Sequence, residues 1–371
     1  MCGISLKPLK MQSSEGTFLK LVRLGIGHTA DALPASVDWP AIQALAVKQG
    51  LLAVVLDGIG RLMQEGSPQA CGMDRTLKKQ WIGQVLRDYE YRYDLYRRAI
   101  AELAGFYNAR GFQMMVLKGY ACSLDWPRPG HRPSGDIDIW LFGKYREADA
   151  ALSAEQGVAI DKSHHHHTVF RWRKFSVENH YDFVNVHARR SSREMEKLFK
   201  ELGLDDAHFV EVDGERVYVP SPDLHALFLL KHAVSHFAST DINLRQLLDW
   251  AFFMEKHGKD VDWEWLLPVL DAYHLRDFFN CVNAICVEDL GFDSDSIPYV
   301  PFDPKQKGRV LDEILSPEFS EESPKGLLPR LSFKYRRWKA NAWKHEMCYN
   351  ESRWSAFWSG IWNHLLKPSS I

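Results

Sequence analysis

The chain has 371 residues, of which 46% are hydrophobic and 25% are charged, as is usual for a globular protein with two or three domains. The formal net charge is −2, so no overall positive field favours long nucleic acid or an anionic membrane, although a local patch could still bind a small anion. There is no run of about 18 apolar residues, so no membrane span is expected.

The six cysteines are scattered and include no Cys-x-x-Cys pair, so they predict neither a disulfide framework nor a zinc site. The first ten residues, "MCGISLKPLK", lack the apolar segment of a secretory signal peptide. Together these features predict a protein of the reducing cytoplasm.

Residues 1–110 are predicted to form a helical N-terminal region. The clearest pattern lies in residues 81–106, where Val85, Tyr89, Tyr93, Tyr96 and Ile100 belong to a series of apolar residues spaced three or four apart. This spacing predicts one long amphipathic helix whose tyrosines pack into the core.

Residues 111–215 are predicted to form an α/β unit around a small sheet. "FQMMVL" (112–117) and "DIDIWLF" (136–142) each indicate a strand, and "TVFRWRKFSVENHYDFVNVHA" (168–188) has the composition of two more. The helical period returns over residues 216–371, with Ser221-Pro222-Asp223 as a helix start and the proline-containing residues 294–330 as a long connection. The predicted fold class is therefore α+β, a small sheet core between two helical regions.

Asp136 and Asp138 stand two positions apart in an apolar run, so a strand would place both carboxylates on one face. Neighbouring like charges repel, and a cation between them removes the repulsion. An all-oxygen arrangement of this kind suits a hard ion such as Mg²⁺. Glycosyltransferases, phosphatases and calcium loops also contain Asp-x-Asp, and two solvated aspartates at a strand start are the simplest alternative.

Residues suited to phosphate binding lie on the N-terminal side of these aspartates. Gly119 permits close approach of backbone to phosphate, and Lys118 supplies a point charge. Arg132 and Ser134 can donate hydrogen bonds to phosphate oxygens. Each of the basic residues, taken alone, is also an ordinary surface charge.

The stretch "VLKG…HRPSGDIDIWL" resembles the nucleotidyltransferase fold of the DNA polymerase β-like superfamily, whose signature is a glycine-containing turn followed by an Asp-x-Asp strand. Within it, the chain is similar to a bacterial group of uncharacterised nucleotidyltransferases. The segments "FLKLVRLGIG", "VDWPAIQALAVKQG" and "LRQLLDWAFF" resemble the helical flanks of that group. Two departures are Gly119-Tyr120 in place of the usual Gly-Ser or Gly-Gly, and a longer gap before Asp136.

The resemblance implies an enzyme that uses Mg²⁺ or Mn²⁺ to move a nucleoside monophosphate from an NTP to a hydroxyl of a small-molecule or protein acceptor. It also implies a third carboxylate on a later strand, which would bind metal with Asp136 and Asp138 and act as general base. The candidate is Glu178, with His180 beside it, and the alternative is Asp182, with His187 as a further polar group. From the helical domain, Lys231 and Arg245 could reach the nucleotide, and Asp249 could pair with Arg245 one turn later.

Two other functions remain open. A non-catalytic nucleotide-binding module, regulatory in the manner of a toxin–antitoxin pair, could retain the same fold. An Asp-x-Asp glycosyltransferase would have a longer α/β sugar-nucleotide domain before the motif, where this chain has a helical pattern.

Two groups of histidines are candidate metal ligands. The run at residues 164–167 could bind a metal, although a polar entry to a strand near the active site is the favoured interpretation. His232 and His236 lie one helical turn apart, a spacing that can chelate a metal, but packing within the helical domain is favoured for them.

Overall fold

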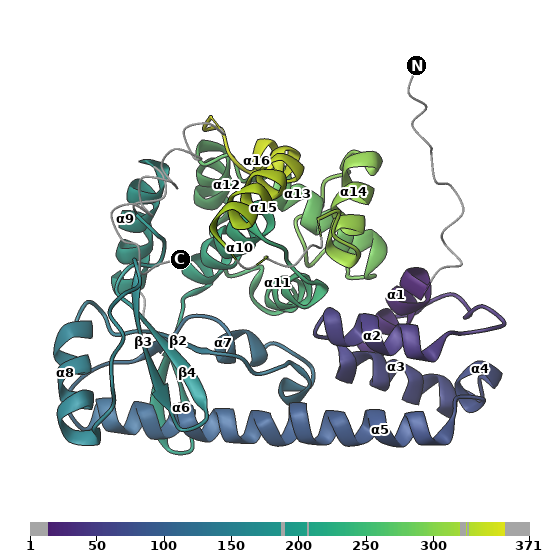
Figure 1. Cartoon of the computed structure of the whole chain (residues 1–371), viewed down its shortest axis with the longest axis horizontal. Coiled ribbons are helices and arrows are strands. Elements are labelled where there is room, and N and C mark those ends of the chain that lie inside the picture. The colour runs from purple at the N-terminus through teal and green to yellow at the C-terminus, as the bar shows by residue number, and fades with distance from the viewer. Residues whose placement is uncertain (1–13, 187–189, 206–207, 320–323, 325, 353–371) are drawn as a thin grey trace.

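A computed structural model of the chain describes residues 14–186, 190–205, 208–319, 324 and 326–352. His187, one of the candidate polar groups, lies outside these residues. In Figure 1 a sheet and one long helix form the lower part of the molecule, the N-terminal helices lie beside them, and the C-terminal helices lie above.

The described chain before the first strand is helical, as predicted. Its elements are α1 (Ser14–Gly25), α2 (Trp39–Lys48), α3 (Leu52–Gln64), α4 (Pro68–Cys71), α5 (Arg75–Val85), the π-helical η1 (Leu86–Tyr91) and α6 (Arg92–Asn108). The last three are continuous and form the long helix along the bottom of Figure 1. This confirms the helix predicted from the spacing in residues 81–106, and Tyr89 and Tyr96 are buried as expected.

In the part of the chain that the structure describes, six strands form one mixed sheet in the order β3-β4-β2-β1-β6-β5. Neighbours are antiparallel except for the β4–β2 and β1–β6 pairs, which are parallel. The strands are β1 (Met115–Val116), β2 (Ile137–Trp140), β3 (His167–Trp172), β4 (Phe175–His180), β5 (His208–Val212) and β6 (Glu215–Val219). A mixed sheet flanked by helices confirms the α+β class.

The two faces of the sheet differ in chemistry. Val116, Ile137, Ile139 and Val177 belong to a buried apolar cluster that also contains residues of α6, such as Leu103. Side chains alternate along a strand, so Asp138 on β2 and Glu178 and His180 on β4 point to the opposite face. The polar face is therefore the one turned toward the C-terminal helices.

Helices α7 (Tyr120–Ser123), η2 (Pro129–His131), α8 (Tyr145–Gln156) and α9 (Arg190–Asp205) lie between strands. After the sheet come α10 (Pro222–Ser239), α11 (Leu244–His257), α12 (Trp263–Ala272), α13 (Arg276–Ala284), η3 (Ile285–Asp289), α14 (Pro304–Leu315), α15 (Leu327–Ala340) and α16 (Ala342–Cys348). The helix start predicted at residues 221–223 is confirmed, because α10 begins at Pro222. No helix within the described ranges has the length and apolar character needed to cross a membrane.

The prediction that residues 294–330 form only a connection is wrong, because α14 lies within them. Pro304 occupies the first helical turn, where the missing N–H has no helical partner to lose. The Asp303 side chain accepts a hydrogen bond from the Lys305 amide and caps the helix. The domain boundaries at 110/111 and 215/216 stay predictions, although α6 covers the sheet and β6 continues it to Val219.

Candidate functional site

The turn after β1 depends on a glycine. Gly119 has φ +60°, which favours glycine, and a Cβ there would lie 2.6 Å from the Tyr96 hydroxyl oxygen. That hydroxyl donates a 2.8 Å hydrogen bond to the Asp136 carbonyl oxygen. Tyr96, on α6, therefore connects the glycine turn with the start of β2.

The carboxylates predicted from the Asp-x-Asp pattern lie beside a third one. Asp138 and Glu178 are direct partners in the parallel β2–β4 pair, and Asp136 precedes β2. His180 Nε2 lies 3.2 Å from Asp138 Oδ1 and 3.6 Å from Glu178 Oε2. One donor atom from each of Asp138, Glu178 and His180 falls within 4.8 Å of the others.

The pKa values of Asp136 and Asp138 are shifted in opposite directions by their surroundings. Burial tends to raise the pKa of Asp138, but the Lys118 charge and the His180 hydrogen bond outweigh burial and lower it. The pKa of Asp136 is raised, first by burial and then by repulsion from Glu178 and Asp138. Asp138 is therefore ionised, and the neighbouring Asp136 carries repulsion that a cation would relieve.

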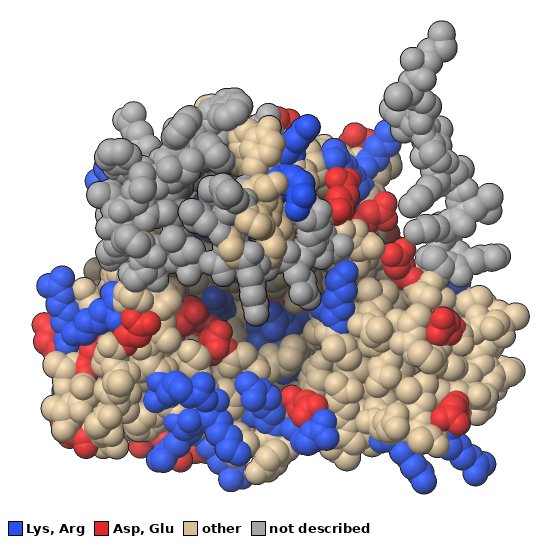
Figure 2. All heavy atoms as spheres, in the orientation of Figure 1, with Lys and Arg blue, Asp and Glu red and all other residues tan. Residues whose placement is uncertain are grey.

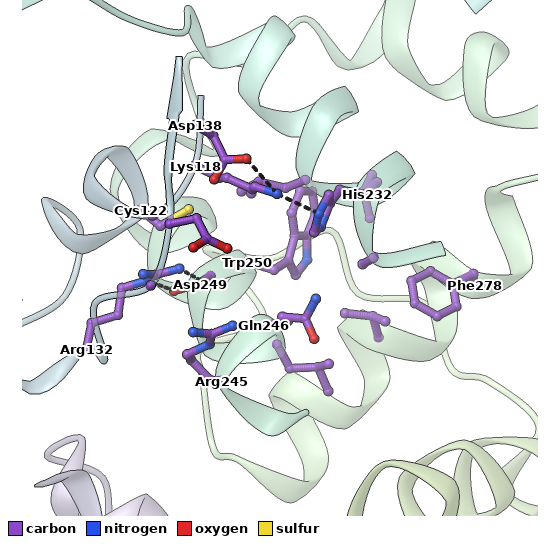
Figure 3. Close-up of a pocket in the computed structure, with 18 residues that line it drawn as sticks. Lys118, Cys122, Arg132, Asp138, His232, Arg245, Gln246, Asp249, Trp250 and Phe278 are labelled. Atoms are coloured by element: carbon purple, nitrogen blue, oxygen red, sulfur yellow. Dashed lines mark hydrogen bonds and ion pairs between the residues drawn. The ribbon is translucent and has the colours of Figure 1, made fainter. Parts of the chain in front are cut away.

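Lys118 forms an ion pair with Asp138. Its Nζ lies 3.0 Å from Asp138 Oδ1 and 3.0 Å from His232 Nε2 (Figure 3). Burial tends to lower the pKa of Lys118, but the Asp138 charge outweighs it and raises the pKa. Burial and, secondly, repulsion from Lys118 lower the pKa of His232 well below its usual value. The His232 ring is therefore neutral, and its Nε2 accepts a hydrogen bond from the Lys118 ammonium. His232 thus contacts the site directly, where the sequence favoured a packing role.

The donor set fits the metal that the sequence predicts. Asp136, Asp138 and Glu178 offer only oxygen ligands, which Mg²⁺ and Mn²⁺ prefer. A charged ammonium 3.0 Å from Asp138 shows that this position already attracts a cation. Asp138 and Glu178 lie in one group of possible ligands together with His180, whereas Asp136 lies outside that group. The metal-binding role of the three carboxylates therefore stays a prediction.

A cavity of about 190 Å³ lies beside the carboxylates, between the sheet layer and helices α10, α11 and α13. Its polar lining includes Lys118, Asp136, Asp138, His232 and Arg245. Figure 3 shows Lys118 and Asp138 approaching the cavity from the sheet layer and His232 and Arg245 from the helices. Basic side chains are visible in the recess between the layers in Figure 2. The enclosed space is smaller than the roughly 300–1,000 Å³ of typical small-molecule pockets, so it suits phosphate groups better than a whole nucleotide.

Asp249 pairs with Arg132 and not with Arg245, so the predicted i,i+4 pair is wrong. Arg132 Nε and Nη2 lie 2.7 and 2.8 Å from the two Asp249 carboxylate oxygens, and Trp126 Nε1 donates to Oδ1 at 2.8 Å. The planar guanidinium matches a carboxylate in this two-point geometry, which outweighs the weaker pairing along a helix. Phosphate binding by Arg132 would require this pair to open.

Arg245 lines the cavity and forms no ion pair among the described residues, although the Asp249 carboxylate, which is already paired with Arg132, attracts it. Its Nε is buried and has no hydrogen-bond partner. Burial lowers the pKa of Arg245, and repulsion from Arg132 adds to this, but an arginine stays charged at neutral pH. A buried, unpaired cation at a cavity wall favours an anionic ligand.

Other predicted residues lie at the edge of this arrangement or away from it. Ser134 is buried with no partner for its Oγ, and its carbonyl oxygen accepts from Arg92 Nε at 2.9 Å. Asp182 is held by Lys200 Nζ at 2.5 Å, beyond the end of β4. Lys231 Nζ lies 5.0 Å from the centre of the Tyr349 ring and is not among the described residues that line the cavity.

The histidine run enters the sheet as expected, because His167 is the first residue of β3. The rings of His166 and His167 nevertheless lie close to His180, with centroids 5.6 and 5.2 Å away. Burial is the main cause that lowers the pKa of His166 to about 3 and of His167 to about 4, so both rings are uncharged at neutral pH. The run of four histidines in the sequence was the signal for this group of rings. No sequence pattern indicated that Tyr96 would bond to the Asp136 backbone or that Arg132 would pair with Asp249.

Comparison with known proteins shows which family the chain resembles. A family model described as uncharacterised nucleotidyltransferase matches residues 35–291, well over half of the chain. A solved structure of an antigenic nucleotidyltransferase-like protein from Paracoccidioides brasiliensis is 12% identical, with a TM-score of 0.31 over 43% of this chain and 74% of that one. No curated protein shows significant similarity to the chain.

Proposed function

Because the chain belongs to the uncharacterised nucleotidyltransferase family, we propose that it transfers a nucleoside monophosphate from an NTP to a hydroxyl of a small-molecule or protein acceptor. The observation that carries the proposal is the direct pairing of Asp138 with Glu178 across β2 and β4, with Asp136 two residues earlier. Asp136 and Asp138 line a cavity that Lys118 and Arg245 also line, and Glu178 lies beside Asp138 on the neighbouring strand.

The reaction is a displacement at the α-phosphorus. The acceptor oxygen forms a new bond to this phosphorus, the bond to the bridging oxygen breaks, and pyrophosphate leaves with its electron pair. Glu178 receives the hydroxyl proton, which it can do because its side chain is only half-buried beside Asp138. Mg²⁺ held by the three carboxylates would neutralise phosphate charge and polarise the reacting centre.

In this proposal, Lys118 and Arg245, which both line the cavity, bind the phosphates of the NTP. Lys118 reaches the carboxylate side, and Arg245 lies on the α11 side with an unpaired Nε. The proposal does not use Arg132 directly, because Asp249 occupies its guanidinium. Arg132 instead holds the loop before β2 against α11.

The test is transfer of label from each of the four NTPs, labelled at the α-phosphate, in the presence of Mg²⁺ and a panel of hydroxyl-containing metabolites and proteins. We expect the full chain to produce a labelled acceptor and pyrophosphate, and Asp136→Asn/Asp138→Asn to lower the rate by at least about 100-fold. Asp94→Asn, an exposed aspartate on α6, is the matched control and should retain the rate.

Metal-dependent NTP binding with no transfer across the whole panel would contradict catalysis. That result would favour the alternative, a nucleotide-binding regulatory module with the same fold. Equal transfer by the wild type and the double variant would contradict the assignment of the aspartates.

A further inference from the structure

Three histidines form a compact group next to the carboxylates. His167 on β3 faces His180 on β4 in the antiparallel pair, which places both rings on the same face of the sheet. His166 directly precedes β3, and its carbonyl oxygen accepts the amides of Tyr181 at 3.0 Å and Asp182 at 3.1 Å. These backbone bonds hold His166 beside the other two, so its ring centroid lies 4.4 Å from that of His167.

Two of the three rings, those of His166 and His167, have a ring nitrogen with no partner among the described residues, whereas both nitrogens of His180 already contact oxygen atoms of Asp182 and Asp138. One ring nitrogen from each of His166, His167 and His180 lies within 4.8 Å of the others. The Nδ1 atoms of His166 and His167 are buried and have no hydrogen-bond partner. A buried polar atom without a partner has lost its bonds to water and gained none in return, so two such atoms in one place call for a ligand.

We propose that His166, His167 and His180 bind a borderline transition-metal ion such as Zn²⁺, at a site distinct from the carboxylate site assigned to Mg²⁺. Imidazole nitrogens suit Zn²⁺ and its neighbours, whereas Mg²⁺ takes oxygen ligands. Three histidines with a fourth position open are a familiar zinc arrangement. Tetrahedral bonds of about 2.1 Å would bring the nitrogens to about 3.4 Å apart, so side-chain movements of about an ångström complete the site.

The two metal positions are contiguous, because His180 belongs to both groups. Its Nε2 lies 3.2 Å from Asp138 Oδ1, so an ion on the histidines changes the field at the carboxylates. Glu178 Oε2 lies slightly farther from His180 Nε2, at 3.6 Å, so either carboxylate can bridge the open position of the histidine site to the Mg²⁺ site. The histidine site therefore couples a second metal to the proposed reaction centre without replacing Mg²⁺.

Metal content of the full chain tests this proposal without any activity measurement. The chain is stripped with a chelator and titrated with Zn²⁺ against a chromogenic competitor, and bound zinc is counted by mass spectrometry. We expect one ion per chain, and a loss of affinity greater than about 100-fold in His166→Gln/His167→Gln, beyond the 10–100-fold typical of outer-shell changes. With Co²⁺ as a spectroscopic probe, the wild type should show the intense visible bands of a tetrahedral site.

Two further variants show whether zinc binds at these three histidines or elsewhere on the chain. His164→Gln changes the same histidine run at a residue outside the group whose ring stacks on that of His167, with centroids 4.7 Å apart. Its loss of affinity should not exceed the roughly 10–100-fold that is typical of a residue next to a ligand. Asp136→Asn should retain zinc even if nucleotide transfer is lost, which distinguishes failure of this proposal from failure of the proposed function. Uptake of no zinc, equal uptake by the His166/His167 double variant, or complete loss in His164→Gln would overturn the proposal.

Discussion

At the scale of single residues, the position of one glycine decides whether the site can form. Gly119 combines φ +60° with a neighbouring hydroxyl that leaves no room for a Cβ. The same hydroxyl, that of Tyr96, holds the backbone at Asp136. A change at Gly119 therefore disturbs both the turn that carries Lys118 and the start of the carboxylate strand.

Gly119→Ala should lower the free energy of unfolding by about 1–3 kcal/mol, because alanine in this backbone region is strained and its methyl group would displace Tyr96. Gly83→Ala is the control, since Gly83 lies in α5 and a Cβ there meets no atom within 4 Å. Alanine also has the higher helix propensity, so this variant should be neutral or slightly more stable. Urea unfolding of both variants measures the effect, and equal stabilities would count against the strain argument.

At the scale of elements, the loop before β2 is attached to α11 by a buried ion pair. The Arg132 and Asp249 side chains are 7% and 6% exposed and meet through two hydrogen bonds. A buried pair adds little net stability compared with apolar packing, but removal of one partner leaves an uncompensated charge. The pair therefore fixes where α11, and with it Arg245, lies relative to the sheet.

Asp249→Asn should destabilise the fold by about 3–5 kcal/mol, because it leaves the Arg132 charge buried without a partner. Glu155→Gln breaks the Arg110–Glu155 pair, whose side chains are 28% and 47% exposed, and should cost at most about 1 kcal/mol. The double variant Arg132→Met/Asp249→Leu should recover much of the loss. Urea unfolding of the set measures this coupling, and a loss in Asp249→Asn no larger than that in Glu155→Gln would contradict it.

At the scale of the whole molecule, the sheet layer and the C-terminal helices meet over a buried histidine. His225 on α10 lies with Nε2 3.7 Å from Cys122 Sγ on α7, and its ring centroid is 5.0 Å from that of Phe253 on α11. Burial is the dominant cause that lowers its pKa to about 4. The charged or titratable groups that face it are Asp125, Asp249, Arg132 and His257.

This histidine makes stability depend on pH in a defined direction. The unfolded chain takes up the proton near pH 6.5, whereas the folded chain does so only near pH 4, so the folded state loses stability as pH falls between these values. The total is roughly 3 kcal/mol for a shift of this size. Urea unfolding of the wild type and His225→Gln from pH 7.5 to 4.5 should show a flatter dependence in the variant, and parallel curves would refute the assignment.

The sequence by itself determined the elements and part of the site. Apolar spacing predicted the long helix that includes Tyr89 and Tyr96, because burial of one helical face requires that period. The two-residue separation of Asp136 and Asp138 predicted both on one face of a strand, because side chains alternate. Asp138 lies in β2, whereas Asp136 comes just before its first residue. The glycine turn after β1 was likewise visible, since few other residues permit it.

Only the tertiary structure decided which distant residues meet. Glu178 lies beside Asp138 because β4 pairs in parallel with β2, and a one-residue shift of register would have turned it to the other face. Asp249 pairs with Arg132, which is distant in the sequence, and not with Arg245, which is one helical turn away. Lys118 likewise contacts His232 because α10 packs against the sheet layer. Local sequence rules describe the periodicity of each segment, whereas these contacts depend on the free energy of packing whole segments together.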